Sequence, residues 1–421
     1  MSRVPSRMGA FLAAYRLDRD LWILFTSFFL WAFGQGMYFY IWPLFMQDLG
    51  ATPVQIGTLF SVAQLTMTLT YVGGGLLADR YDRKWVMILS WLIAVPSALV
   101  FARATRWTDL LPGIVMFYCF SGMPAFNAYV AARVSSTSRA SAFSIVYASA
   151  PLGMLFAPAL GGLLAEVVGM RTVFLISFGV YVAATLVMLP LRSQRPQPAS
   201  APAPGQDASA GTGAIPGHVT DIKPVKLATL IPTFTLVTLA YFLLFVATPY
   251  ISPYLRASCG MGMAQIGILG SVTAASELAL SLVFGGVGGK WGKVPALAFS
   301  LTLFALSIAC LTLPGGLYLL MLAFVLRGAA RLAQSLMTAM VPDVSPRHAL
   351  GRHFGAFGAL TGVATVAAPY LGGWLYDLSP TGLFAGAACA IFALAIVVQA
   401  LAVIARARQT RRRDGTPRVP A

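Results

Sequence analysis

Charged side chains are rare within the long apolar runs of this chain, and one small group of them could bind a charged ligand. Glu277 lies in one such run, and Arg327 and Arg331 lie in another. Gln334 falls on the same helix face as the two arginines, because the three positions are spaced i, i+4 and i+7. Charges in an apolar environment are costly, so they indicate an ion pair or a water-filled cavity.

Two interpretations of this group stay open. In the first, Glu277 neutralises an arginine and the pair is structural. In the second, two arginines and one glutamate line a cavity with one net positive charge, which would favour an anionic group, and Glu277 carries a coupled proton. Both runs are expected to enter the membrane from the same side, which places Glu277 and Arg327 at a similar depth.

The composition indicates which kind of element holds these residues. Of 421 residues, 58% are hydrophobic and only 10% are charged, and the mean hydropathy is +0.77. A soluble protein carries about 25% charged residues to cover its surface. This composition excludes a soluble enzyme, a disordered chain and a coiled coil, and it predicts a polytopic membrane protein.

Twelve runs are long enough to span a bilayer, for which about 20 apolar residues are needed. They cover residues 21–45, 54–78, 85–102, 110–132, 141–165, 171–190, 229–251, 264–288, 294–313, 316–341, 350–376 and 381–404. We expect an all-α membrane protein with the following parts: a six-helix bundle over 1–190, a flexible linker over 191–226, a second six-helix bundle over 227–405, and a basic tail over 406–421.

The distribution of Lys and Arg predicts the orientation in the membrane. With the N-terminus in the cytoplasm, 23 basic residues fall on the cytoplasmic side and 4 on the opposite side. We therefore expect a plasma (inner) membrane protein with both termini and the linker in the cytoplasm. The net charge of +16 reflects this topology, so no nucleic-acid partner is expected, and the basic tail would meet anionic lipid at the cytoplasmic face.

The two halves of the chain repeat each other. A shift of 210 residues places Gly50, Gln55, Ile56 and Gly57 on Gly260, Gln265, Ile266 and Gly267. A shift of 211 places the segment 157–162 on 368–373. Because each shift spans six helices, the halves have the same orientation, and we expect a pseudo-two-fold axis along the membrane normal.

One loop contains a specific motif. After the second run, residues 75–84 read Gly-Leu-Leu-Ala-Asp-Arg-Tyr-Asp-Arg-Lys. This segment resembles the signature loop of the major facilitator superfamily, G-x-L-A-D-R-x-G-R-K, and departs from it at Asp82, where the family usually has Gly. The resemblance implies two six-helix bundles that rock about a central site and expose it to one side at a time.

The resemblance also implies a conformational latch, formed by Gly75, Asp79, Arg80, Arg83 and Lys84. Asp79 would accept hydrogen bonds from free N–H groups at the start of span 11 and hold the cytoplasmic side shut. The basic residues would pair with nearby carboxylates or anionic lipid. The alternative is a basic loop that sets the topology without forming a latch.

Spans 5 and 11 share the pattern Ala-Pro-x-x-Gly-Gly, in which small residues allow close helix packing and proline bends the helix. The residues are Gly153, Pro158, Gly161 and Gly162 in span 5, and Pro369, Gly372 and Gly373 in span 11. The span 5 segment resembles the antiporter motif of drug–proton exporters, although close packing alone also explains it. Span 4 lacks the Arg-x-x-Gln-Gly of such exporters, because Tyr118 and Ser121 occupy the Arg and Gln positions.

Spans 1 and 7 line the cavity in the family that this chain resembles. Gln35 and Tyr38 in span 1 and Tyr241 and Thr248 in span 7 are therefore expected to face a substrate, with Asn127 in span 4 as a further candidate. Aromatic surface with a few hydrogen-bonding groups suits an amphipathic organic ligand. Ordinary helix packing with an interfacial aromatic belt is the alternative.

The expected function is secondary transport of a small molecule by a monomer that works by alternating access. Export of a small amphipathic or anionic compound, coupled to a proton or other ion gradient, is the first choice. The alternatives are uptake of an organic anion or sugar-like solute, and a non-transporting membrane receptor or assembly partner. The sequence shows no nucleophile–base pair, phosphate loop or metal-ligand pattern, so we expect no enzymatic activity, cofactor or metal.

Overall fold

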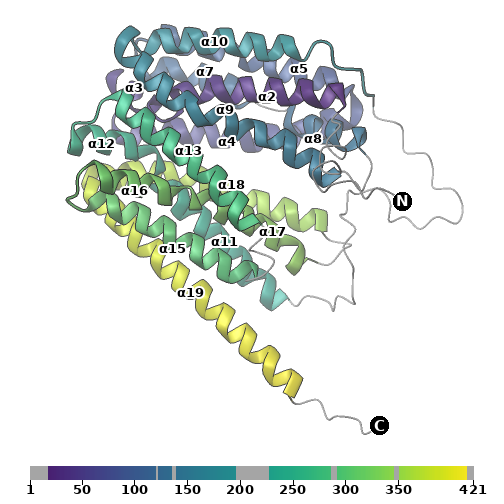
Figure 1. Ribbon diagram of the computed structural model, residues 1–421, viewed down its shortest axis with the longest axis vertical. Helices are drawn as coiled ribbons and strands as arrows, with labels where there is room; N and C mark the ends of the chain where they lie inside the picture. Colours follow the sequence, from purple (N-terminus) through teal and green to yellow (C-terminus); the bar gives the residue numbers. More distant parts are fainter. Residues whose placement is uncertain are drawn as a thin grey trace, which may run out of the picture.

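The computed structural model describes residues 18–119, 122–134, 139–195, 227–285, 292–345 and 350–414. Within these ranges the regular elements are helices, and twelve helical segments are long and apolar enough to cross a membrane. The predicted all-α architecture of twelve spans is confirmed. Figure 1 shows the first six spans stacked as one bundle above a second bundle formed by the other six.

The N-terminal bundle contains spans that are interrupted next to prolines. Its helices are α2 (Arg19–Phe39), α3 (Trp42–Asp48), α4 (Pro53–Arg80), α5 (Arg83–Ala94), α6 (Ser97–Arg103), α7 (Leu110–Tyr118), α8 (Gly122–Arg133), α9 (Arg139–Val168) and α10 (Met170–Val187). Pro43 lies in the first turn of α3, and Pro96 precedes α6. Proline lacks the N–H that would continue the preceding helix, so the chain changes direction there. The first of these breaks leaves Tyr40 just after α2.

The C-terminal bundle follows the same order of elements. Its helices are α11 (Leu227–Val246), α12 (Ile251–Cys259), α13 (Met263–Gly285), α15 (Lys293–Thr312), α16 (Leu317–Arg327), α17 (Ala329–Met340), α18 (Leu350–Leu378) and α19 (Pro380–Asp414). The break between α16 and α17 falls at Gly328, directly after Arg327. Helix α19 continues past residue 405, so part of the predicted tail is an extension of the last span.

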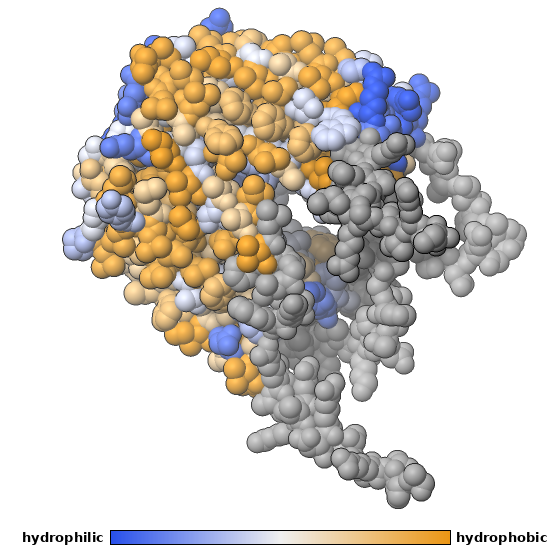
Figure 2. Space-filling model, viewed as in Figure 1, coloured by the Kyte–Doolittle hydropathy of each residue, from blue (hydrophilic) through white to orange (hydrophobic). Residues whose placement is uncertain are grey.

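The two ends of the molecule differ, and we name them by their connections. The linker end is where α4 ends at Arg80 and where the chain leaves α10. The closed end is the opposite one, which contains the turns at Gly50, Gly169 and Gly260. The linker end lies on the right of Figure 1. Figure 2 shows that the surface is hollowed between the bundles on that side.

The bundles are packed together at the closed end through two helix pairs, α9 with α13 and α4 with α18. Ser61 Oγ donates a hydrogen bond to Val366 O at 2.6 Å. Ala159 N donates to Ser271 Oγ at 3.0 Å. The structure is therefore a conformation that is shut at this end and open at the linker end.

The small residues of the α9 motif allow close packing against helices of both bundles. A Cβ on Gly153 or Gly161 would overlap the backbone of α2, in the same bundle. A Cβ on Gly162 would lie 3.1 Å from Cα of Gly267, in the other bundle, and Pro158 O also lies against Gly267. Glycine is thus required where α9 contacts both neighbours.

The repeated motif in α18 has the same division of contacts. A Cβ on Gly372 would overlap the backbone of α11, in its own bundle. A Cβ on Gly373 would lie 2.6 Å from Pro53 O of α4, across the interface, and Pro369 O lies against Gly57. Close packing between rocking helices is therefore a direct consequence of these residues.

Candidate functional site

The charged group predicted from the sequence is assembled where α16 ends against α13. Gly328 makes this possible, since a Cβ there would lie 2.7 Å from the backbone nitrogen of Glu277. Thr273 Oγ1 donates to Phe324 O at 3.2 Å and ties the two helices together. Glu277 and Arg327 therefore lie on adjacent helix segments.

Arg327 has few partners. Its Nη2 donates to Thr248 Oγ1 at 3.3 Å, and its guanidinium carbon lies 5.9 Å from the centroid of the Phe304 ring. Its Nη1 is buried and has no hydrogen-bond partner among the described residues. A buried donor on a cation is unfavourable until water or a ligand satisfies it. Arg327 is thus well suited to bind an acidic group.

Glu277 forms no ion pair with either arginine. Its side chain takes part in no ion pair or hydrogen bond among the residues that the structure describes. Glu277 and Gln334 are partly buried, whereas Arg331 is exposed. The structural pair that the sequence left open is therefore absent from this conformation.

Tyr40 of the other bundle completes this layer. A Cβ on Gly270 of α13 would lie 2.5 Å from the Tyr40 ring, and Ser252 Oγ donates to Tyr40 O. The Tyr40 hydroxyl lies beside Thr273 and within electrostatic reach of Glu277 and both arginines. Tyr40 thus separates the charged group from the closed end of the molecule.

A cavity of about 40 Å³ remains between Tyr40, Thr248 and Arg327. Reasoning from the sequence missed Tyr40, although the internal repeat contained a signal. The shift of 210 places Tyr40 on Tyr250, and Tyr250 also lies at the interface, where its hydroxyl oxygen is 3.4 Å from Pro53 O of α4.

The prediction that Tyr38 faces the cavity is wrong. Tyr38 is only 2% exposed, and its hydroxyl oxygen lies 2.8 Å from that of Tyr181 in the core of the N-terminal bundle. Trp42 and Phe101 pack against its ring. Large aromatic side chains contribute most when they are buried among other rings, so this face of span 1 turns inward.

The remaining predicted cavity residues lie in separate polar groups. Asn127 of α8 accepts a hydrogen bond from the Tyr147 hydroxyl of α9. Tyr241 of α11 lies near Arg331. Gln35 is partly buried, and its side chain forms no hydrogen bond with a described residue. The structure thus brings Thr248, Glu277 and Arg327 towards one layer. Tyr241 lies near this layer because it is close to Arg331, whereas Asn127 lies apart from it.

Two larger cavities lie within the C-terminal bundle, and both are lined mainly by apolar side chains. One of about 540 Å³ lies between α11 and α18. The other, of about 510 Å³, lies among α11, α15, α17 and α19, beside an ion pair of 2.7 Å between Lys293 and Asp343. Neither is lined by Glu277 or Arg327, so the charged site is distinct from both.

The motif loop at the linker end is not latched in this conformation. Asp79 and Arg80 end α4, are exposed, and form no side-chain hydrogen bond with the described part of the chain. Gly75 has open space where a Cβ would project. Lys84 lies over the Trp85 ring, with Nζ 5.3 Å from the centroid. These observations fit a latch that would form only when the linker end closes.

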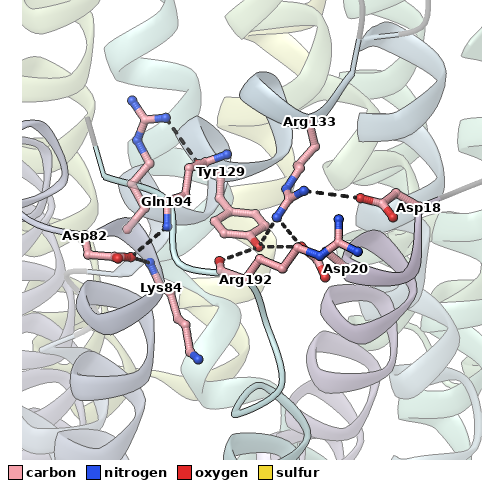
Figure 3. Close-up of polar contacts among 9 residues, drawn as sticks. Asp18, Asp20, Asp82, Lys84, Tyr129, Arg133, Arg192 and Gln194 are labelled. Atoms are coloured by element: carbon pink, nitrogen blue, oxygen red, sulfur yellow. Dashed lines mark hydrogen bonds and ion pairs between the residues drawn. The ribbon is translucent and has the colours of Figure 1, made fainter. Parts of the chain in front are cut away.

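Asp82, the departure from the family motif, fastens the start of the linker (Figure 3). Its carboxylate accepts from Lys84 N at 2.9 Å, from Gln194 N at 3.1 Å and from the Ser193 hydroxyl. Arg83 donates to Gln194 Oε1 at 3.2 Å. Burial raises the pKa of Asp82, but these hydrogen bonds outweigh burial and hold the pKa below its ordinary value.

A second group of polar side chains contacts Arg192, the residue before Ser193 and Gln194, as Figure 3 also shows. The Tyr129 hydroxyl lies 2.8 Å from Asp20 Oδ2 and 2.9 Å from Arg192 O. Arg133 pairs with the buried Asp20 and, at 3.4 Å, with Asp18. Residues 192–194 are therefore part of the N-terminal bundle, whereas the predicted linker residues 196–226 lie outside the described residues.

The sequence matches the family model described as Major Facilitator Superfamily over residues 24–250 and 233–420. The chain belongs to the Major Facilitator Superfamily. The family resemblance predicted from residues 75–84 is thus confirmed. As a superfamily member the protein is a transporter and not an enzyme.

Curated relatives of this superfamily member include drug exporters. It is 25% identical to multidrug resistance protein MdtG of Proteus mirabilis over 368 residues, 85% of this chain and 89% of that protein. It is 26% identical to quinolone resistance protein NorA of Staphylococcus aureus over 36% of this chain and 39% of NorA. It is 24% identical to an MFS-type transporter of Methanocaldococcus jannaschii over 38% of this chain and 42% of that protein.

Solved structures of other transporters share the fold. A mutant of the nucleoside transporter NupG matches with a TM-score of 0.75 and 16% identity, covering 91% of this chain and 99% of NupG. The human organic anion transporter MFSD10 matches with a TM-score of 0.62 and 17% identity, covering 91% of this chain and 100% of MFSD10. At these identities the likeness extends to the architecture alone.

Proposed function

We propose that this transporter exports amphipathic compounds that carry an acidic group. The observation that supports this most directly is the buried Nη1 of Arg327, which has no partner among the described residues and lies beside a small cavity. The Phe304 ring lies beside the Arg327 guanidinium, and the Tyr40 ring lines the cavity, so both offer apolar surface to a ligand. An acidic group on an aromatic body would satisfy both features.

Export is proposed to be coupled to inward proton movement at Glu277. For exchange, proton and substrate must compete for one group. Glu277 supplies such a group, because it forms no ion pair within the described ranges and is available to a donor or cationic group of the substrate. The proposed substrate therefore places its acid on Arg327 and a donor on Glu277, and a proton on Glu277 displaces it.

The direction rests on the relatives and on span 5. MdtG and NorA are named for drug resistance, and the Gly153–Gly162 segment resembles an antiporter motif. A second candidate is uptake of a simple organic anion together with a proton. Electrostatics favours uptake when the ligand is a simple anion, because protonation of Glu277 removes a negative charge near Arg327 and strengthens anion binding.

The test uses purified protein in liposomes with an imposed pH gradient. The probes are a fluorescent quinolone, which is an aromatic acid with an amine, and pyrenesulfonate, which is a fluorescent aromatic acid without one. We expect the quinolone to move against the proton flow, and Arg327→Gln to raise its KM at least tenfold. Movement of either probe with the protons would support uptake instead, and no gradient-driven flux would contradict both proposals.

The protein is proposed to be a monomer in the plasma (inner) membrane. In the proposed orientation, the linker end faces the cytoplasm. The excess of basic residues at that end supports it, and these residues would contact anionic lipid. Single cysteines placed within 191–226 should react with an impermeant thiol reagent only after the cells are opened. Labelling in intact cells would contradict this orientation.

A further inference from the structure

A carboxylate at the closed end contacts the start of a helix in the other bundle. Glu166 lies in the last turn of α9, and its Oε1 accepts a hydrogen bond from Ala264 N, in the first turn of α13, at 2.9 Å. A negative charge near the C-terminus of its own helix is unfavourable, but near the N-terminus of another helix it is stabilising. The carboxylate of Glu166 is therefore stabilised by α13 and not by its own helix.

The internal repeat explains why α13 needs this contact. In the first half, α4 is capped by its own Thr52, whose Oγ1 accepts from Gln55 N at 3.4 Å, while Gln55 Oε1 accepts from Thr52 N at 2.9 Å. The shift of 210 places Gly262 on Thr52 and Gln265 on Gln55.

Only half of this reciprocal cap survives in the second half. Gln265 Oε1 still accepts from Gly262 N, at 3.1 Å, but Gly262 has no hydroxyl to accept in return. Glu166 instead supplies an acceptor for the adjacent N–H, that of Ala264. Gly262 also provides the space, since a Cβ there would overlap Glu166 Oε1. The glycine that removes the local cap of α13 is thus the same residue that leaves room for Glu166 to cap this helix.

The matching carboxylate in the other half has no such role. The shift of 211 takes Glu166 to Asp377 of α18, which is exposed and forms no hydrogen bond with the described residues. Its counterpart helix, α4, already has Thr52 as a cap and begins with Pro53, which has no N–H to donate. Asp377 is therefore an internal control for Glu166.

We propose that Glu166 is a latch that holds the closed end shut by capping α13 across the bundle interface. It mirrors the latch expected of Asp79 at the linker end. Both carboxylates belong to the N-terminal bundle, and the two helix pairs involved, α9 with α13 and α4 with α18, are those that join the bundles. In this conformation Glu166 accepts its hydrogen bond, whereas the Asp79 side chain forms none with a residue that the structure describes.

This inference goes beyond the proposed substrate and direction, and it requires only that the bundles rock. Spin labels on Arg106→Cys and Ser258→Cys, with the four native cysteines replaced, would report the width of the closed end in lipid nanodiscs. Glu166→Ala should raise the ratio of open to shut conformations at that end about three- to tenfold, the range for a partly exposed, charge-assisted hydrogen bond. Asp377→Ala should leave the ratio unchanged.

A second variant separates a latch from a mere helix cap. Glu166→Ala combined with Gly262→Thr should give α13 a local cap like that of α4 and recover any thermal stability lost by Glu166→Ala. The closed end should nevertheless remain more open than in the wild type, because the contact between the bundles is still missing. An unchanged distance distribution in Glu166→Ala, or full restoration of it in the double variant, would overturn the proposal.

Discussion

Tyr40 and Gly270 are in contact across the bundle interface, with no room for a side chain on Gly270: a Cβ there would lie 2.5 Å from the Tyr40 ring. This contact covers the charged layer of Glu277 and Arg327 from the closed end. Access to that layer from the closed end therefore requires the ring to separate from α13. We therefore expect the contact of the Tyr40 ring with Gly270 to act as part of a gate.

Gly270→Val should force the closed end apart. Overpacking a well-packed contact costs about 1–3 kcal/mol, which is enough to change the ratio of two conformations about fivefold or more. The same spin-label pair at the closed end would measure the shift. Gly179→Ala is the matched control, because nothing lies within 4 Å of a Cβ at that position. An equal response of both variants would refute the role of Tyr40 in gating.

Glu277→Gln should stay folded and lose proton-driven transport. If Glu277 neutralised an arginine, its removal would cost about 3–5 kcal/mol. Because Glu277 has no ion pair in the described structure, we expect a change in unfolding temperature of only a few degrees. Exchange of labelled for unlabelled quinolone across liposomes should persist while uphill accumulation disappears. Uphill transport at the wild-type rate would remove Glu277 from the coupling mechanism.

Asp79→Asn should favour the conformation described here. The expected hydrogen bond to the start of α18 is worth about 1.5–3 kcal/mol, so its loss should lower the ratio of shut to open linker ends about tenfold or more. Spin labels on the exposed Tyr81 and Ile404 would report the width of the linker end. Combining this change with Glu166→Ala should bring the ratio back towards that of the wild type, since the two sites are far apart and their effects should add.

Asp82→Gly, which restores the usual residue of the family, should release residues 193–194 from the motif loop. The pKa of Asp82 is lowered in the folded state, so its contribution is present above its ordinary pKa of 3.8 and is lost as the pH falls through the folded value. A spin label at Arg195→Cys should be immobilised near neutral pH and should become mobile only as the pH falls below the ordinary pKa of 3.8 towards the lowered folded value.

In Asp82→Gly the same label should be mobile at every pH. Asp48→Asn is the control, because Asp48 pairs with Arg256 at 2.7 Å at the opposite end of the molecule. A label that remains immobilised in Asp82→Gly would show that Arg83 alone holds Gln194.

The sequence by itself determined the twelve spans, the internal repeat, the family and the charged layer. These features depend on composition and on spacing along one chain, such as the apolar length of a span or the i, i+4 spacing of Arg327 and Arg331. The packing role of Gly162 and Gly373 was also predictable, because close helix contacts select small residues whatever the partner.

Only the tertiary structure decided which faces meet and which groups pair. Helical periodicity groups residues on one face of span 1, but it does not say whether that face meets a cavity or a bundle core, so Tyr38 was misplaced and Tyr40 was missed. The absence of an ion pair at Glu277 and the cap that Glu166 forms on α13 depend on contacts between different helices. These residues are 50 or more positions apart in the chain, where local sequence patterns contain no distance information.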